Sequence, residues 1–163
     1  MKVIVIGPRG KMGKLITQVA AERDDMELVA GVAPAGRDYV GQDLGMVALI
    51  GRNLGVPVVD DLAAVIDGCD VIIDFSTREN ALKVLDLAVK HGKALVCGTT
   101  GFSEEEFARF KEAAKTIPML YAANTSKLVN IMNKLLEMVT KTLGEDADIE
   151  ILEMHDQWKK DAP

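Results

Sequence analysis

The stretch Val-Ile-Val-Ile-Gly-Pro-Arg-Gly-Lys-Met-Gly, residues 3–13, joins a β-branched run to a helical pattern through three glycines. Gly7 permits a tight turn, Gly10 allows the backbone to approach a pyrophosphate closely, and Gly13 allows the helix to pack on the strand. The N-terminus of the following helix offers free N–H donors and the positive end of its dipole to phosphate groups. The stretch therefore predicts a dinucleotide-binding turn, with an ordinary structural turn as the alternative.

Outward from this stretch, short β-branched runs alternate with helical patterns. The predicted strands are Lys2–Ile6, Glu27–Val32, Val56–Val59, Asp70–Phe75, Lys93–Cys97, Met119–Ala122 and Ile149–Met154. The predicted helices are Gly10–Glu22, Leu62–Ile66, Arg78–His91, Ser103–Lys115 and Ser126–Leu143, and residues 34–56 are Gly-rich and irregular. Apolar strands separated by helices are typical of a parallel sheet that is covered on both faces. We therefore predict an α/β fold with a Rossmann-like, doubly wound parallel sheet.

Polar residues and one glycine predict where three of the helices begin or end. Asp60 or Asp61 can accept a backbone hydrogen bond at the start of the Leu62–Ile66 helix. Gly92 stands where a C-terminal cap glycine belongs, and Ser103 with Glu106 predicts a capping box.

A domain boundary is expected near Asn124–Lys127, where the regular alternation ends. Residues 1–126 form the predicted dinucleotide-binding domain. Residues 127–163 supply one long helix and one strand before Pro163. We expect them to be the start of a second, α+β domain that this chain does not complete.

Composition narrows the function classes. Apolar residues make up 48% of the chain and charged residues 27%, which is enough for a packed core, and the net charge of -6 argues against a surface that coats nucleic acid. The sequence has no apolar run of membrane-spanning length and no signal-peptide pattern, so we expect a cytoplasmic protein. Cys69 and Cys97 form no CxxC pair and are expected to be small buried side chains, and we expect no metal site.

The carboxylate that usually binds the adenosine ribose is missing. An Asp or Glu is expected at the end of the second strand, about 20 residues beyond the glycines, but that strand ends Val-Ala-Pro-Ala-Gly-Arg at residues 32–37. Arg9 and Arg37 could instead bind the 2′-phosphate of NADPH, although both could equally be solvated surface residues. This slightly favours NADPH over NADH, and both cofactors stay open.

Further motifs follow the predicted strands in order. They are Gly-Thr-Thr-Gly-Phe at 98–102, Ala-Ala-Asn-Thr-Ser at 122–126 with Asn130, Glu-Met-His at 153–155 and Lys-Lys-Asp-Ala-Pro at 159–163. Together with Gly-x-x-Gly-x-Met-Gly at the start, the chain resembles the N-terminal portion of the 4-hydroxy-tetrahydrodipicolinate reductase family.

The resemblance implies an oxidoreductase of lysine and diaminopimelate biosynthesis. Such an enzyme reduces 4-hydroxy-tetrahydrodipicolinate, a small dicarboxylate, to tetrahydrodipicolinate with NADPH or NADH, and the family's full-length enzyme is a homotetramer with a substrate-binding and tetramerisation domain. The implied cofactor-binding residues are Gly7, Pro8, Arg9, Gly10, Lys11, Met12, Gly98, Thr99, Thr100, Ala122, Ala123, Asn124 and Thr125.

The resemblance also implies that His155 donates a proton and that Lys159 is its cationic partner. Asp156 stands where the family usually has a second histidine that helps to hold the substrate, and the family's Ser-Gly-Thr, expected directly after Pro163, is absent. We therefore expect this chain to be incomplete and poorly active by itself.

Other functions stay open on the residues alone. His155 could be a hydrogen-bonded structural residue, and Lys159, beside Lys160, could be solvated. The chain could be a non-catalytic NAD(P)-binding sensor that acts through a partner, or part of a related amino-acid or amine dehydrogenase. The His155–Lys159 pair favours the reductase, because a sensor needs no proton donor.

Overall fold

The computed structural model describes residues 1–152 and 154 and divides the chain into two compact units. The first unit is Met1–Ala123 and the second is Asn124–Pro163. The sequence placed the boundary between residues 126 and 127. That residues 127–163 begin a substrate-binding domain stays a prediction.

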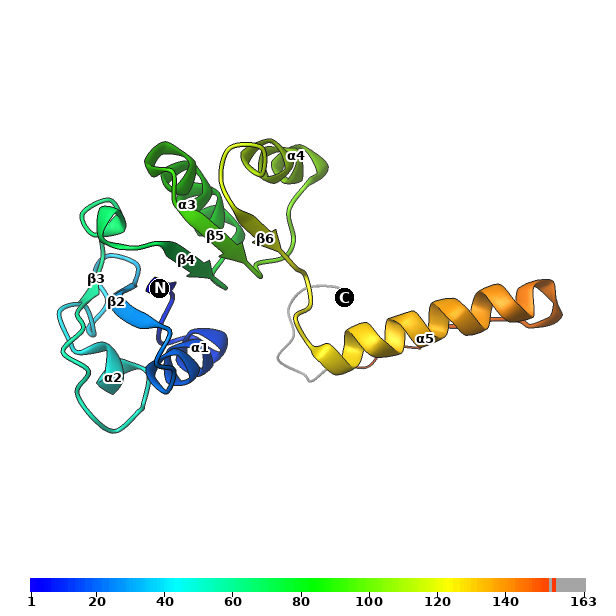
Figure 1. The fold of residues 1–163 in the computed structure, drawn as a ribbon, viewed down its shortest axis with the longest axis horizontal. Helices are drawn as coiled ribbons and strands as arrows, with labels where there is room; N and C mark the ends of the chain where they lie inside the picture. Colours follow the sequence, from blue (N-terminus) through cyan, green and yellow to red (C-terminus); the bar gives the residue numbers. More distant parts are fainter. Residues whose placement is uncertain (153, 155–163) are drawn as a thin grey trace. The chain divides into compact units, whose positions relative to one another are not determined.

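The first unit is built on a six-stranded parallel sheet (Figure 1). Its strands are β1 Lys2–Ile6, β2 Glu27–Val32, β3 Val58–Val59, β4 Val71–Asp74, β5 Ala94–Cys97 and β6 Met119–Tyr121. They lie in the order β3-β2-β1-β4-β5-β6. Chain progression therefore reverses between β1 and β4, and this reversal confirms the doubly wound sheet predicted from the alternating pattern.

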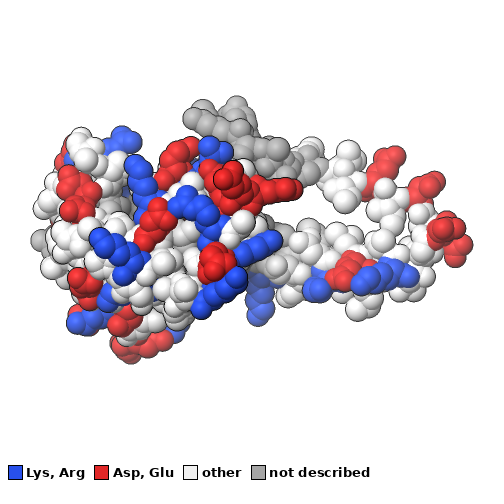
Figure 2. All heavy atoms as spheres, turned by 90° about the horizontal axis from the view of Figure 1, so that it is seen from above, with Lys and Arg blue, Asp and Glu red and all other residues white. Residues whose placement is uncertain are grey.

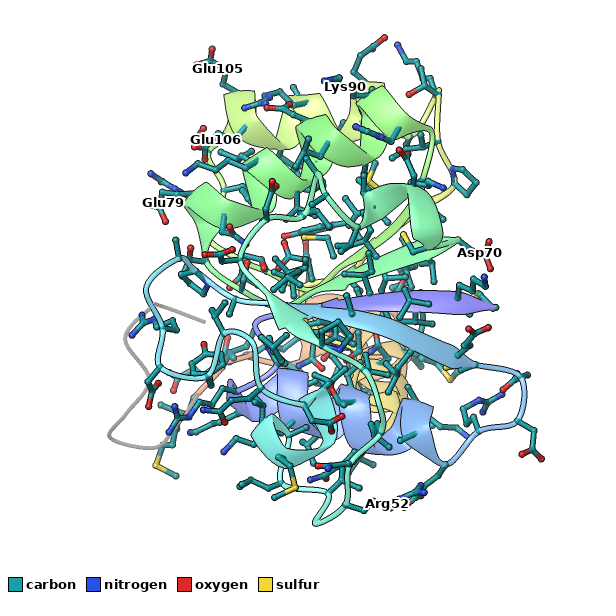
Figure 3. All side chains as sticks on the ribbon, turned by 90° about the vertical axis from the view of Figure 1, so that its left-hand side faces the viewer. Arg52, Asp70, Glu79, Lys90, Glu105 and Glu106 are labelled. Atoms are coloured by element: carbon teal, nitrogen blue, oxygen red, sulfur yellow. The ribbon has the colours of Figure 1, made fainter. Side chains whose placement is uncertain are left out.

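Helices cover both faces of this sheet. They are α1 Lys11–Ala21, α2 Leu44–Val47, α3 Arg78–His91 and α4 Glu104–Ala113, with a 3-10 helix η1 at Ile66–Gly68. Figure 3 shows α3 and α4 on one side of the sheet and α1 and α2 on the other. The pleat explains the division, because successive side chains of a strand point to opposite faces. Ile4 and Ile6 pack in the cluster that contains residues of α3 and α4, whereas Val3 and Val5 pack in the cluster that Ile16 of α1 joins.

The predicted caps of two helices are confirmed. Gly92 ends α3 in the left-handed conformation, with φ 62°. Ser103 accepts a hydrogen bond from the Glu106 N–H, and the Glu106 carboxylate accepts one from the Ser103 N–H. These local signals work because a cap involves only neighbours in the chain.

Two local predictions in the first unit were wrong. Residues 62–66 do not form an α-helix: Asp61 accepts one hydrogen bond from the Ala63 N–H, but the chain makes turns and then the short η1. Asp67 and Gly68, poor helix formers, follow at once. Residues 34–56 are not wholly irregular, since α2 forms within them.

Asp43 organises this Gly-rich segment. Its carboxylate accepts hydrogen bonds from the backbone N–H groups of Gly45, Leu54, Gly55 and Val56, at 2.7–3.2 Å. Burial raises the pKa of this carboxyl, but the four donors together outweigh that effect and hold the pKa below its usual value. One side chain thus caps α2 and joins it to the segment that leads into β3.

The second unit contains one long helix, α5 Lys127–Leu143, followed by a 3-10 turn η2 at Gly144–Asp146. Ser126 caps the helix by accepting a hydrogen bond from the Val129 N–H. The strand predicted at Ile149–Met154 is not formed by residues 149–152 and 154. A strand needs a partner for its backbone groups, and the described part of this unit contains no other strand.

Candidate functional site

Four loops begin at the carboxyl ends of four neighbouring strands in the sheet of the first unit. They follow β1, β4, β5 and β6, and the reversal of strand order lies between β1 and β4. Ligands of open α/β sheets bind in the crevice at such a reversal. Three backbone hydrogen bonds join the loops to their neighbours, from Gly7 N to Val32 O, from Gly98 N to Asp74 O and from Ala122 N to Cys97 O, at 2.8–3.1 Å.

The glycine turn has the geometry that its spacing predicts. Gly7 has φ +66°, a backbone conformation that residues other than glycine rarely adopt. The Gly10 N–H donates to the Gly7 carbonyl at 3.0 Å and closes the turn. A Cβ atom on Gly13 would lie 2.1 Å from the Gly7 oxygen, so α1 can approach β1 this closely only because residue 13 has no side chain.

The start of α1 is suited to an anion. Its first N–H groups have no acceptor within the helix, its N-cap is Gly10, which supplies no side-chain acceptor, and its first turn has no acidic residue. Lys11 is exposed beside it. Six residues that are expected to bind the cofactor form this turn and the start of α1: Gly7, Pro8, Arg9, Gly10, Lys11 and Met12. Their cofactor role stays a prediction.

Arg9 is not a free surface arginine. Its Nη1 donates to Asp38 Oδ1 at 2.9 Å, and its guanidinium lies over the Tyr39 ring, 5.0 Å from the centroid. Arg37 is exposed, and its side chain forms no hydrogen bond or ion pair with any described residue. Asp38 and Tyr39 were not predicted as site residues, because the ribose-binding acid is expected only at the end of β2.

The loop after β4 contributes Phe75, which the sequence analysis also missed. A Cβ atom on Gly98 would lie 2.0 Å from Phe75 Cε1, so the ring occupies the space that a side chain at residue 98 would need. The signal in the sequence was an aromatic residue at the end of the predicted strand Asp70–Phe75. Gly98 therefore lets the Phe75 ring lie against the backbone that begins the Gly-Thr-Thr-Gly segment.

Asp74 ends β4 and is completely buried. Its Oδ1 accepts a hydrogen bond from the Ser76 N–H at 2.9 Å, whereas Oδ2 has no hydrogen-bond partner among the described residues. Burial raises the pKa of this carboxyl, and the hydrogen bonding from Ser76 offsets only part of that effect. Asp74 was not predicted as a site residue, because only the three-dimensional packing shows that this strand end is covered.

Cys97 and Thr99 lie beside Asp74. Cys97 is paired with Asp74 in the register of β4 and β5, and burial raises the pKa of its thiol to about 11. The nearby Asp74 carboxyl also raises this pKa, and the Thr99 N–H and hydroxyl partly offset the increase. Thr99 is buried, and its hydroxyl makes no hydrogen bond of good geometry with the described residues. Both cysteines are buried, as the sequence predicted.

The remaining residues predicted to bind the cofactor are divided between the two units. Thr100 is exposed after β5, and Ala122 and Ala123 follow β6 in the first unit. Asn124 and Thr125 belong to the second unit, where Asn124 Oδ1 accepts a hydrogen bond from the Ser126 N–H.

The three residues implied in catalysis or substrate binding, His155, Asp156 and Lys159, lie outside the described residues. Their roles stay predictions.

Arg78, at the start of α3, is engaged by two carboxylates. Its Nε lies 3.7 Å from an oxygen of Glu79 and 3.7 Å from one of Glu106. Figure 3 labels both acids, which come from the first turns of α3 and α4. Figure 2 shows Lys, Arg, Asp and Glu residues interspersed over the face it displays.

Two surface grooves lie away from these loops. One, of about 370 Å³, lies between α3 and α4 and is lined by residues such as Leu85, Val89 and Arg109. The other follows α5 in the second unit. Within residues 1–152 and 154, no cluster of three or more His, Cys, Asp or Glu side chains could hold a metal, and no helix is long and apolar enough to cross a membrane.

A family model and curated relatives that match this chain are all described as the same reductase. The family model described as "Dihydrodipicolinate reductase, N-terminus" matches residues 1–125. The 4-hydroxy-tetrahydrodipicolinate reductase of Geobacter metallireducens is 47% identical over all of this chain and 60% of its own length. That of Hahella chejuensis is 43% identical over 99% of this chain and 60% of its own length.

A solved structure adds to these relatives. The dipicolinate-bound dihydrodipicolinate reductase from Paenisporosarcina sp. TG-14 superposes with a TM-score of 0.70 at 26% identity. The match covers 86% of this chain and 53% of that one.

Proposed function

The chain belongs to the dihydrodipicolinate reductase family, whose N-terminal part it matches, and from this premise we propose that its first unit binds NADPH or NADH for the reduction of 4-hydroxy-tetrahydrodipicolinate to tetrahydrodipicolinate. The chain spans about 60% of the length of the curated relatives it matches. The observation that carries the proposal is the glycine turn at the reversal of strand order.

The residues of the turn fit a pyrophosphate. The start of α1 offers N–H donors and no competing carboxylate in its first turn, and Lys11 adds a positive charge. Gly10 is exposed, so a phosphate can approach its backbone without meeting a side chain. Gly7 to Met12 would therefore hold the phosphates.

The loops after β5 and β6 would hold the other end of the cofactor. We assign Gly98, Thr99 and Thr100 to the nicotinamide and its ribose, and the segment 122–125 to the opposite side of that pocket. The buried hydroxyl of Thr99, which makes no hydrogen bond of good geometry with the described residues, supports this assignment, because a buried polar group without a good partner is costly unless a ligand supplies one. When bound, the reduced nicotinamide supplies the hydride.

His155 would donate the proton that accompanies reduction. Histidine exchanges protons near neutral pH, and Lys159 would supply a positive charge for a substrate carboxylate or a developing anion. Asp156 would lie beside the dicarboxylate, and its repulsion would have to be offset by Lys159 or Lys160. We further propose that the protein acts in the cytoplasm, within lysine and diaminopimelate biosynthesis, as a homo-oligomer.

Calorimetric titration with NADPH and with NADH tests the cofactor site. Gly10→Val should abolish or strongly weaken binding of both, because the side chain would block the approach to the pyrophosphate. Gly68→Val is the matched control, since a Cβ atom at Gly68, in η1, meets no atom within 4 Å. Equal binding by wild type and Gly10→Val would refute the phosphate site.

Oxidation of NADPH or NADH in the presence of freshly generated 4-hydroxy-tetrahydrodipicolinate tests the reaction. In a chain extended through the second domain, His155→Gln should depress turnover while leaving cofactor affinity nearly unchanged. Unchanged turnover in this variant would remove His155 from the mechanism. A chain extended through the second domain that binds cofactor and never consumes it with this substrate would favour the sensor instead.

A further inference from the structure

We propose that Asp38 sets the balance between NADPH and NADH by neutralising Arg9 at the adenosine end of the site. This inference rests on the proposed cofactor site and concerns which of the two cofactors that site prefers. NADPH differs from NADH only by a phosphate on the 2′-hydroxyl of the adenosine ribose. A group that discriminates between them must therefore act at that position.

The acid at the end of β2 that would normally bind the ribose is replaced in this chain by Ala33 and Pro34. The structure shows that a carboxylate nevertheless reaches the glycine turn. Asp38 comes from the loop beyond β2, and its Oδ1 lies 2.9 Å from Arg9 Nη1. Two residues 29 positions apart in the chain thus form an ion pair beside the proposed phosphate site.

The loop holds Asp38 there independently of Arg9. Tyr39 is buried in a cluster with Leu44 and Val58, only 9% exposed. The Gln42 side chain donates to the Asp38 carbonyl at 2.8 Å, and the Gly41 N–H donates to the Val58 carbonyl at 2.7 Å. Asp38 is therefore held between a buried ring and the edge strand β3.

Tyr39 also positions Arg9, whose guanidinium lies over the ring. Arginine is suited to a phosphate because its planar group donates two parallel hydrogen bonds. A 2′-phosphate that reaches Arg9 would find one nitrogen already engaged and a carboxylate beside it. The ribose hydroxyl of NADH has no charge and would not meet this repulsion. Asp38 thus disfavours NADPH relative to NADH, whereas Arg9 alone would favour it.

The exposure of the Arg9 and Asp38 side chains limits how strongly Asp38 can change the cofactor preference. The Arg9 and Asp38 side chains are 53% and 79% exposed, so water and salt screen their charges. We expect Asp38→Asn to raise the affinity for NADPH relative to NADH by about two- to fivefold at low ionic strength. The gain should shrink as ionic strength rises past about 0.15 M.

Titration of Asp38→Asn with both reduced cofactors, at low and high ionic strength, is the test. Asp24→Asn is the charge-matched control, since Asp24 is an exposed carboxylate just beyond the end of α1. The control should leave the NADPH-to-NADH ratio unchanged. Arg9→Gln should lower the affinity for NADPH, and Asp38→Asn should have no further effect on the ratio in that background.

The outcomes separate this inference from the proposed function. If the wild type binds both cofactors but Asp38→Asn and Asp38→Ser leave their ratio unchanged, Asp38 has no role in the choice and only this inference is overturned. A gain that is equally large with Arg9→Gln in place would also overturn it, since Asp38 would then act without Arg9. If the wild type binds neither cofactor, the proposed function fails and this inference with it.

Discussion

A Cβ atom on Gly13 would lie 2.1 Å from the carbonyl oxygen of Gly7, inside the distance that any real contact allows. A Cβ atom on Gly10 would lie 3.2 Å from the same oxygen, which is tight but reachable by a small shift. The glycines of the turn therefore differ in what they do. Gly13 is required by the packing of α1 on β1, whereas Gly10 keeps the exposed side of the turn open.

Gly13→Ala should destabilise the first unit severely. The methyl group would meet backbone atoms of Gly7 and Pro8, which cannot move without displacing α1 from the sheet. We expect the free energy of unfolding to fall by about 3 kcal/mol or more, whereas Gly10→Ala should cost about 1 kcal/mol or less. Urea denaturation of the two variants provides the measurement. Equal losses would show that the turn adapts and that Gly13 is not a packing requirement.

Gly98→Ala should cost less than Gly13→Ala, because the methyl group meets the far end of a side chain. The Phe75 ring can rotate away, and we expect a loss of about 1–3 kcal/mol. In a Phe75→Leu background the same substitution should be nearly neutral. A double-mutant cycle of unfolding free energies measures this coupling. If the two substitutions prove additive, Phe75 does not occupy the space above Gly98.

Asp43→Asn should loosen the segment between β2 and β3. The amide cannot accept all four backbone hydrogen bonds, and we expect a loss of about 1–3 kcal/mol at neutral pH. The folded pKa of Asp43 is lowered, so its stabilisation is present above the unfolded pKa of about 3.9 and is lost as pH falls through the folded value. The difference between wild type and variant should therefore shrink in acid.

The control for Asp43 is Asp61→Asn, because Asp61 is exposed and accepts a single backbone hydrogen bond, from Ala63. Its cost at neutral pH should be about 1 kcal/mol or less. Chemical denaturation of both variants across the acidic range gives the comparison. A loss for Asp43→Asn that equals the control would mean that the four bonds contribute no more than one.

Asp74→Asn should have the opposite pH dependence. The folded pKa of Asp74 is raised by burial, so its contribution to stability is complete below the unfolded pKa and is lost as pH rises through the folded value. The free energy of unfolding of the variant should therefore rise relative to that of the wild type between about pH 4 and pH 7, by about 1–3 kcal/mol. Unfolding free energies measured at both pH values decide the matter. Parallel pH profiles would show that Asp74 is ionised at no cost and has a partner for Oδ2.

The local elements were predictable because their causes are local. Ser103 and Glu106 form a capping box with each other, and Gly92 ends α3 by its own φ. The glycines at 7, 10 and 13 predicted the turn between β1 and α1, since a close approach there excludes side chains. The prediction failed at residues 62–66, where the pattern was too short to predict a helix, and at residues 149–152, for which the described part of the second unit offers no partner strand.

The sequence by itself determined the fold class and the family, because alternating apolar strands and helices have few ways to bury their apolar faces, and because the motifs lie in a fixed order along the chain. The candidate site needed the tertiary structure. Only the sheet brings Asp38 to Arg9, places the Phe75 ring over Gly98, and covers Asp74 so that one of its oxygens has no partner among the described residues. Each of these relations joins residues that are far apart in the chain or depends on burial from several elements. Their physical cause is the packing of the sheet, which no local pattern records.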